Sequence, residues 1–219
     1  IDNLNDLYAN ADLVFKVQRP IDHPTAGKNE IDLMKKGTIL ISFVYVLHYT
    51  DIAKKCAEKG IDLISMDMIP RTTLAQKMDV LSSQANIAGY KSVILAANEL
   101  GKIFPLMMTA AGTISPAKVV IMGAGVAGLQ ALGTAKRLGA VVEVSDIRTA
   151  VKEEVQSLGG RFIEVEGAED MQDAGGYAKE ASPEFLQKQK ETIFKHVTEA
   201  DIVITTALVP GKKAPILVS

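Results

Sequence analysis

A glycine-rich turn between a strand and a helix is the feature that most constrains the fold of this chain. Gly123-Ala-Gly-Val-Ala-Gly128 matches the pattern G-x-G-x-x-G, follows a β-branched run at 118–122 and opens a helical segment at 126–138. This context predicts a dinucleotide-binding turn. The first glycine permits the tight turn, the second lets the backbone approach a pyrophosphate, and the third lets the helix pack on the strand. The anion would rest on the free N–H groups at the helix start.

An acidic residue stands where such a turn requires one. Asp146 follows the next predicted strand, 140–144, eighteen residues after Gly128. Its carboxylate can accept both hydroxyls of an adenosine ribose and repel a 2′-phosphate, which predicts NAD(H) rather than NADP(H). Arg148 is a competing signal, because a guanidinium can pair with a 2′-phosphate. We interpret Arg148 as a surface or pyrophosphate-side residue.

Strands and helices alternate through this half of the chain. The predicted strands span residues 118–122, 140–144, 161–165 and 201–205, and the predicted helices span 126–138, 150–158 and 182–198. This alternation predicts a doubly wound parallel sheet. The usual form has six strands, which would need more chain after Ser219, and the sequence starts at Ile1 without an initiator Met. We therefore expect both ends to be cut from a longer polypeptide.

A second α/β region precedes it. Strands are predicted at 12–17, 38–46 and 61–66, and helices at 30–36 and 51–59. The run 38–46 is typical of a strand buried on both faces. A long helix is predicted over 73–100, where Gly89 indicates a break or a close helix approach. The fold class is therefore α/β: two Rossmann-like βαβ domains joined by a long helix, with domains at 1–112 and 113–219.

Composition excludes several classes of protein. With 24 Lys and Arg against 26 Asp and Glu, the chain lacks the basic excess of a nucleic-acid binder. Cys56 is the single cysteine, so one chain can build neither a disulfide framework nor a cysteine-based metal site. Metal-ligand spacings are absent, and no apolar run is long enough to span a bilayer.

Two polar segments are candidates for substrate contact. Gln76, Asp79 and Ser82 are spaced three apart at the start of the predicted long helix, so they would share or nearly share one face. With Arg71 they form a polar set that would orient a nicotinamide and its ribose if it faces the nucleotide; the alternative is a solvated helix face. Residues 166–181 are polar and aperiodic, and Gly175-Gly176 precede Tyr177 there. This segment is either a lid that closes over a nucleotide or a surface insertion with an incidental tyrosine.

Two residues of the first region suggest catalysis of another kind. Lys16 lies in an apolar strand, where a buried ammonium needs a partner and would hold a carboxylate substrate. His48 follows the run 38–46, where a general acid or base would sit. A structural role is the alternative for each of them.

Several of these motifs resemble one known family. Arg71-Thr-Thr-Leu-Ala-Gln-Lys-Met-Asp-Val-Leu-Ser-Ser-Gln-Ala-Asn-Ile-Ala-Gly-Tyr90 resembles the NAD(H)-binding component of proton-translocating nicotinamide nucleotide transhydrogenase. The same resemblance extends to Met107-Met-Thr-Ala-Ala-Gly112, the Gly123 turn with Leu129-Gln-Ala131, Ala174-Gly-Gly-Tyr-Ala-Lys-Glu180 and Ile204-Thr-Thr-Ala-Leu-Val-Pro-Gly-Lys212. It runs from about Ile61 to Ser219 and is looser before Ile61.

The resemblance implies a role for each candidate residue. Arg71, Gln76, Asp79 and Ser82 would place the nicotinamide, with Gln76 also near the partner's nucleotide, and Tyr177 would belong to a mobile loop that closes on NAD(H). The residues implied to bind the cofactor are Gly123, Gly125, Val126, Ala127, Gly128, Asp146, Ile147, Arg148, Gly176, Ala207 and Leu208. The implied reaction is that of an Re/Si-specific NAD(P)+ transhydrogenase. Such direct hydride transfer needs alignment and water exclusion rather than a general acid or base.

The resemblance also implies partners. NADP(H) would be held on a separate domain, and a membrane domain would couple hydride transfer to proton translocation. A homodimer is implied, peripheral to a membrane on its cytoplasmic or mitochondrial matrix face. The main alternative is alanine dehydrogenase, which shares the fold. Lys16 resembles the substrate-binding lysine of that enzyme, and His48 resembles its catalytic histidine. A nucleotide-sensing domain without turnover is a third hypothesis.

Overall fold

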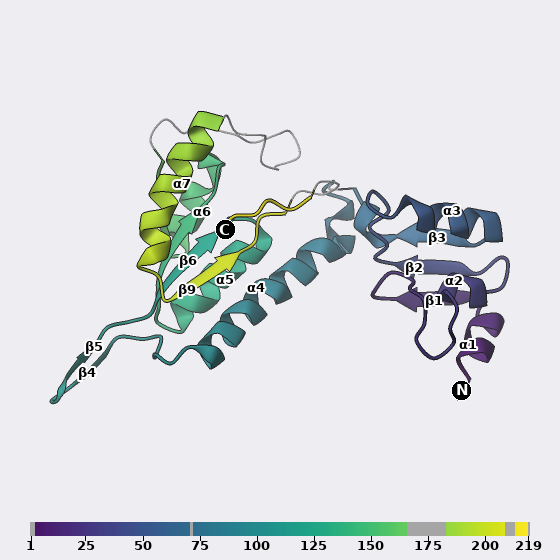
Figure 1. Ribbon diagram of the computed structural model, residues 1–219, viewed down its shortest axis with the longest axis horizontal. Coiled ribbons are helices and arrows are strands. Elements are labelled where there is room, and N and C mark those ends of the chain that lie inside the picture. The colour runs from purple at the N-terminus through teal and green to yellow at the C-terminus, as the bar shows by residue number, and fades with distance from the viewer. Residues whose placement is uncertain (1–2, 71, 166–182, 209–212, 219) are drawn as a thin grey trace. The chain divides into compact units, whose positions relative to one another are not determined.

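The computed structural model describes residues 3–70, 72–165, 183–208 and 213–218 and divides the chain into two compact units, Ile1–Leu81 and Ser82–Ser219. Each unit contains a parallel β-sheet with helices packed on it (Figure 1). The division falls within the first turn of the long helix α4 (Val80–Glu99), and Val93 of this helix packs into the core of the second unit.

The first unit holds three parallel strands in the order β1-β2-β3. Its strands are β1 (Leu13–Lys16), β2 (Ile39–Ser42) and β3 (Asp62–Ser65), and its α-helices are α1 (Leu4–Asn10), α2 (Glu30–Leu33) and α3 (Thr50–Lys59). A 3₁₀ turn, η1 (Met66–Met68), follows β3. Tyr8 of α1, Ile31 of α2 and Ile52 of α3 share one buried cluster with Leu40 of β2. The predicted order of strands and helices in this region is therefore confirmed.

The central strand of this sheet differs from its prediction. Only Ile39–Ser42 pair in the sheet, and Ile39 is exposed while Leu40 is buried, so the expectation of a long strand buried on both faces was wrong. The chain turns at Tyr45, whose φ is +55°. Asp67 Oδ1 stabilises that turn by accepting the N–H groups of Val44 at 2.9 Å and Tyr45 at 3.0 Å.

The predicted long helix is interrupted near its start. A 3₁₀ turn, η2 (Ala75–Met78), is followed by α4 (Val80–Glu99), and Asp79 between them has a ψ of 83°. The spacing of three between Gln76, Asp79 and Ser82 therefore does not place them on one face of a continuous helix. That part of the sequence-based interpretation was wrong.

The second unit contains the predicted four-stranded parallel sheet, in the order β8-β7-β6-β9. Its strands are β6 (Lys118–Met122), β7 (Val141–Ser145), β8 (Arg161–Phe162) and β9 (Ile202–Thr205), and its other helices are α5 (Val126–Arg137), η3 (Thr149–Val151), α6 (Lys152–Ser157) and α7 (Pro183–Thr198). Successive residues of a strand point to opposite faces. Accordingly, Val119 and Ile121 pack with helices α4, α5 and α6, and Val120 and Met122 pack with α7.

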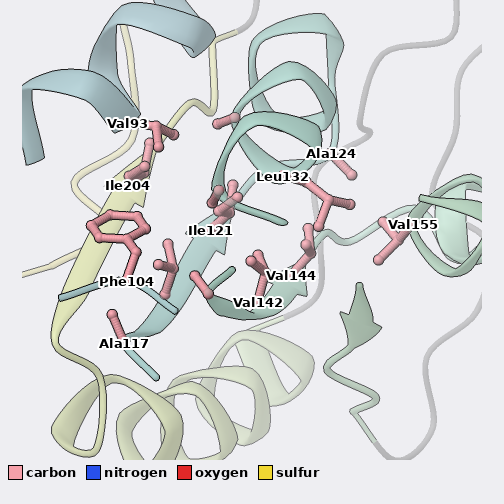
Figure 2. Close-up of a cluster of buried hydrophobic side chains, with 14 of the residues drawn as sticks. Val93, Phe104, Ala117, Ile121, Ala124, Leu132, Val142, Val144, Val155 and Ile204 are labelled. Carbon is pink, nitrogen blue, oxygen red and sulfur yellow. The ribbon is translucent and has the colours of Figure 1, made fainter. Parts of the chain in front are cut away.

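The larger of these two cores holds the glycine turn (residues 123–128) in place. Figure 2 shows Leu132 of α5 and Val93 of α4 among the side chains of Ile121, Val144 and Ile204 from three neighbouring strands. Leu132, Ile121 and Val144 are completely buried. Because such interiors are close-packed, β6 and α5 hold the loop between them in one position.

A two-stranded antiparallel hairpin extends from this unit. Strands β4 (Met107–Thr109) and β5 (Gly112–Ile114) pair with each other, and Figure 1 shows them projecting from the four-stranded sheet. Met108 is 74% exposed. The sequence analysis did not predict these strands, because only their turn residues were recognised.

Candidate dinucleotide-binding site

The predicted cofactor residues in the described part of the chain gather at one edge of the four-stranded sheet. Met122, the last residue of β6, pairs with Ser145 of β7 and with Thr205 of β9. The strands are parallel, so the loops that follow all three leave the sheet at the same edge. Such carboxyl-end edges are where open α/β sheets bind ligands.

The loop after β6 has the geometry that its glycines predict. Gly123 has a φ of +112°, which side chains rarely adopt. A Cβ atom at Gly128 would lie 1.8 Å from the carbonyl oxygen of Gly123, so helix and strand approach too closely for any side chain there. A Cβ atom at Gly125 would meet nothing within 4 Å. The first and third glycines are therefore required by the fold, whereas the second leaves open space above the backbone.

Helix α5 begins at this open space. Gly125 is its N-cap and provides no capping side chain. The N–H groups of a helix's first turn have no partners within the helix, and the helix dipole places positive charge there. The N–H groups of Val126, Ala127 and Gly128 belong to this first turn. The turn and the helix start thus fit the pyrophosphate of a dinucleotide.

Asp146 lies directly after β7, beside the glycine turn. Its Oδ2 atom accepts the N–H of Ala124 at 2.7 Å, which joins the loops after β6 and β7. Burial acts to raise the pKa of this carboxyl, but hydrogen bonds from Arg148 and the Ala124 N–H outweigh it and hold the pKa below its ordinary value. The Asp146 carboxyl is therefore ionised at neutral pH.

Arg148, which the sequence analysis expected to be a surface or pyrophosphate-side residue, lies against Asp146. Its guanidinium forms an ion pair with Asp146, with Nη2 2.8 Å from Oδ2, and the exposed fractions of the two side chains are 15% and 7%. Ile147 lies between them in the same loop and is half-buried.

The loop after β9 completes this edge. A Cβ atom at Gly123 would lie 3.2 Å from the backbone nitrogen of Ala207, which places Ala207 beside the glycine turn, and Leu208 follows it with 66% exposure. Thr206 also belongs here, because its hydroxyl donates to the carbonyl oxygen of Gly123 at 3.0 Å. Sequence reasoning missed Thr206, although its position directly after a predicted strand was a usable signal.

The remaining predicted site residues belong to other segments of the chain than the loops at this edge. Arg71, Gly176 and Tyr177 lie outside the described residues, so their assignments stay predictions. Gln76 and Asp79 belong to the first unit, and Ser82 begins the second.

Lys16 of the first unit pairs with a carboxylate of the same unit, and His48 lies away from the end of β2. Lys16 Nζ lies 2.8 Å from Glu30 Oε1, and that oxygen also accepts the hydroxyl of Tyr8 at 3.1 Å. Burial and the neighbouring Glu30 carboxylate raise the pKa of Tyr8 to about 12. His48 is exposed and lies six residues beyond the end of β2, not at its end. The ammonium of Lys16 therefore has a carboxylate partner within the chain.

Two kinds of feature are missing from the described residues. None of their helices is long and apolar enough to cross a membrane. In the same residues, no three His, Cys, Asp or Glu side chains gather in a group that would hold a metal ion.

Comparison with known proteins places this geometry in a family. Residues 1–88 match the N-terminal domain, and residues 92–219 the C-terminal domain, of the alanine dehydrogenase/PNT family. An NAD(P) transhydrogenase alpha subunit of Rhodospirillum rubrum is 49% identical over 213 residues, which cover 96% of this chain and 55% of the relative. The chain thus spans about half the length of this relative.

Solved structures agree with this assignment. The transhydrogenase of Sinorhizobium meliloti superposes with a TM-score of 0.82 at 44% identity, covering 99% of this chain and 56% of that one. An L-alanine dehydrogenase superposes with a TM-score of 0.70 at 25% identity, covering 100% of this chain and 54% of that one. Both structures confirm the α/β fold class with Rossmann-like parallel sheets. The chain belongs to the alanine dehydrogenase/PNT family, and its relatives of higher identity are transhydrogenase alpha subunits.

Proposed function

We propose that this chain is the NAD(H)-binding component of a proton-translocating, Re/Si-specific NAD(P) transhydrogenase. The observation that carries the proposal is the open space over Gly125, bordered by the start of helix α5 and by the ionised Asp146. The 49% identity to a transhydrogenase alpha subunit supports it. An acidic residue at this position suits a ribose with two free hydroxyls, which is why we assign NAD(H) rather than NADP(H).

Each part of the site has one task in this proposal. The first-turn N–H groups of α5 and the uncovered backbone at Gly125 bind the pyrophosphate. Asp146 accepts the adenosine ribose hydroxyls, and Ala207 and Leu208 border the nucleotide from the loop after β9. Donation of a hydride to NADP+ held on a partner domain is the chemistry that NADH supplies when it is bound. The remaining work of the protein is alignment and exclusion of water.

The residues that would align the nicotinamide are proposals of the same kind. We assign this role to Arg71, Gln76, Asp79 and Ser82, and assign Tyr177, with Gly176 before it, to a lid that closes over NAD(H). Tyr177→Phe is then expected to slow hydride transfer more than it weakens NADH binding. Unchanged single-turnover transfer at saturating NADH would remove the lid assignment.

The partners in this proposal are an NADP(H)-binding domain and a membrane domain that conducts protons. The chain itself would lie at the membrane surface, on the cytoplasmic face or, in a mitochondrion, on the matrix face. Sedimentation of the intact protein with membranes, with and without the membrane domain, tests this location. Retention on vesicles without that domain would contradict the proposal.

A homodimer is also part of the proposal, and the hairpin β4–β5 supports it. Leu106, Met107, Met108 and Ile114 are exposed on it, and residues 103–117 contain no charged side chain. An isolated two-stranded hairpin is marginally stable in water, so a second copy of this uncharged surface is a suitable cover. Met108→Lys is expected to shift sedimentation from dimer toward monomer, while an unchanged dimer would remove the hairpin from the interface.

The competing activity is that of alanine dehydrogenase. It would need Lys16 to hold a carboxylate substrate, but Glu30 already neutralises Lys16 at 2.8 Å. Alanine dehydrogenase of Methanococcus maripaludis is 25% identical to this chain, against 49% for the transhydrogenase relative. Both observations favour the transhydrogenase proposal.

One assay separates these activities. In a first reaction the intact protein is mixed with NADH, pyruvate and ammonium. In a second reaction NADP+ and an NADP(H)-binding partner domain replace the pyruvate and ammonium. The proposal expects saturable NADH binding, no oxidation with pyruvate and ammonium, and hydride transfer once the partner is present. Steady NADH oxidation by pyruvate and ammonium alone would replace the proposal with alanine dehydrogenase.

A further inference from the structure

The carboxylate proposed to bind ribose is fully occupied by the protein itself. Asp146 Oδ1 accepts the backbone N–H and the Nε–H of Arg148, both at 2.9 Å. Asp146 Oδ2 accepts Arg148 Nη2 at 2.8 Å and the Ala124 N–H at 2.7 Å. A carboxylate offers about four acceptor positions, so none is left for a ribose hydroxyl.

Two of the four donors can leave and two cannot. The N–H groups of Ala124 and of residue 148 belong to the backbone of the loops after β6 and β7, which the packed strands hold. The guanidinium bonds to Asp146 are made by the side chain of Arg148, which can change its rotamer. Two ribose hydroxyls can therefore replace two Arg148 N–H groups, one on each carboxylate oxygen, and leave every acceptor satisfied.

We propose that Arg148 is a specificity-determining residue that occupies the ribose position of Asp146 until a 2′-hydroxyl nucleotide displaces it. This inference rests on the proposed NAD(H) site and goes beyond it. A 2′-hydroxyl and a 3′-hydroxyl donate two hydrogen bonds and so replace those that Arg148 gives up. A 2′-phosphate has no proton to donate at neutral pH and would leave the buried carboxylate facing a second anion.

The ion pair also keeps Arg148 away from phosphate. Guanidinium groups bind phosphates in a bidentate manner, and a free arginine in this loop would favour NADP(H). The two contacts with Asp146 use the Nε–Nη2 edge of the guanidinium, one of the edges at which a phosphate can bind in a bidentate manner. Discrimination between the two nucleotides therefore belongs to the pair and not to Asp146 alone.

Three variants of the intact protein test this inference. Arg148→Met removes the donors at similar length, Asp146→Asn releases Arg148, and the double variant removes both groups. Dissociation constants and association rates for NADH and NADPH are measured by titration calorimetry and stopped-flow fluorescence at one salt concentration. Circular dichroism confirms that each variant is folded.

The expected signs differ between the variants. Arg148→Met should bind NADH several-fold more tightly and faster, because no ion pair must be broken first. Asp146→Asn should lose roughly tenfold or more in NADH affinity and gain a similar factor for NADPH, since one tenfold step corresponds to the loss of one good hydrogen bond. The double variant should lose that gain for NADPH, because Arg148 supplies it.

The opposite result has a distinct meaning. If Arg148 only orients Asp146, Arg148→Met will weaken NADH binding and leave the ratio of NADH to NADPH affinities unchanged, which overturns the inference. The inference is also overturned if Asp146→Asn does not gain affinity for NADPH, or if the double variant keeps that gain in affinity. Failure of the unaltered protein to bind NADH would instead reject the proposed function.

Discussion

Gly89, in the middle of helix α4, lies directly against the carbonyl oxygen of Ala127 in the first turn of α5. A Cβ atom at Gly89 would be 2.1 Å from that oxygen and 3.0 Å from the Ala127 Cα. Of the two expectations for this glycine, a close helix approach is therefore confirmed, and α4 continues unbroken through it. The contact makes α4 a support for the start of α5, where the pyrophosphate is proposed to bind.

This contact predicts that Gly89→Ala damages both stability and binding. The added methyl group must push α4 away from the backbone of Ala127, and overpacking of this kind costs about 1–3 kcal/mol. NADH affinity should fall with it, because Ala127 belongs to the binding turn. Thermal unfolding and NADH titration measure the two effects.

Gly133→Ala provides the matched control, since Gly133 lies in helix α5 and a Cβ atom there would meet nothing within 4 Å. It should leave binding intact and stabilise the helix by up to about 1 kcal/mol. Equal behaviour of the two alanine variants would contradict the role given to the Gly89 contact.

The second and third glycines of the binding turn should respond differently to alanine. Gly125→Ala adds a methyl group in open space, at a φ of −82° that alanine adopts readily, so folding should be unaffected. The same methyl group would occupy the proposed pyrophosphate position, and NADH affinity should fall by about tenfold or more. Gly128→Ala forces a contact with the Gly123 carbonyl and should lower the unfolding temperature. Normal NADH binding by Gly125→Ala would remove the pyrophosphate from this turn.

The Asp67 carboxylate should stabilise the turn at Tyr45 in a pH-dependent way. Burial acts to raise the pKa of Asp67, but hydrogen bonds from Ser65, Tyr45 and Val44 outweigh it and lower the pKa. A lowered native pKa means that this stabilisation is complete above the unfolded value, about 3.9, and is lost as the pH falls through the native pKa.

The protection factors of the Val44 and Tyr45 amides report this effect directly. They should be lower by about tenfold in Asp67→Ala at about pH 6 and should approach those of the unaltered protein under acid conditions. Asp62→Ala, which removes an exposed carboxylate from the same strand region, is the control. A difference that persists undiminished in acid would show that charge on Asp67 does not hold this turn.

Glu143 and Glu199 both pair with Lys118, but they should differ in their effect on stability. Glu143 has a side chain only 9% exposed and also lies 2.8 Å from His196 Nδ1, whereas the side chain of Glu199 is 71% exposed. Glu143→Ala should cost about 1–3 kcal/mol, because it removes a nearly buried carboxylate that accepts from both Lys118 of β6 and His196 of α7. Glu199→Ala should change the free energy of unfolding by less than about 1 kcal/mol. Equal losses in urea unfolding would contradict the distinction.

The parts of the fold that sequence predicted are those whose signals lie close together in the chain. The segment from β6 through Gly123 and Gly128 into α5 needs only a strand, a turn and a helix in direct succession. Gly60 ends α3 in the left-handed conformation, as its position after the predicted helix indicated. Each of these features follows from local backbone chemistry.

Other features could not be read in this way. The early end of β2 depends on Asp67, which lies 22 residues beyond Tyr45 and accepts its N–H. The interruption at Asp79 separates Gln76 from Ser82, although their spacing alone is compatible with one continuous helix. In both cases the backbone conformation depends on contacts or torsion angles that the spacing of hydrophobic residues does not predict.

By itself, the sequence determined that this chain forms parallel α/β units with a glycine turn and an acidic residue after the following strand. Turn geometry and strand–helix alternation are local properties, and they do not depend on what packs nearby. Only the tertiary structure decided that Ala124 and Arg148 together occupy the carboxylate of Asp146. That choice depends on which donors reach one buried carboxylate when the loops after β6 and β7 meet at the same edge of the sheet.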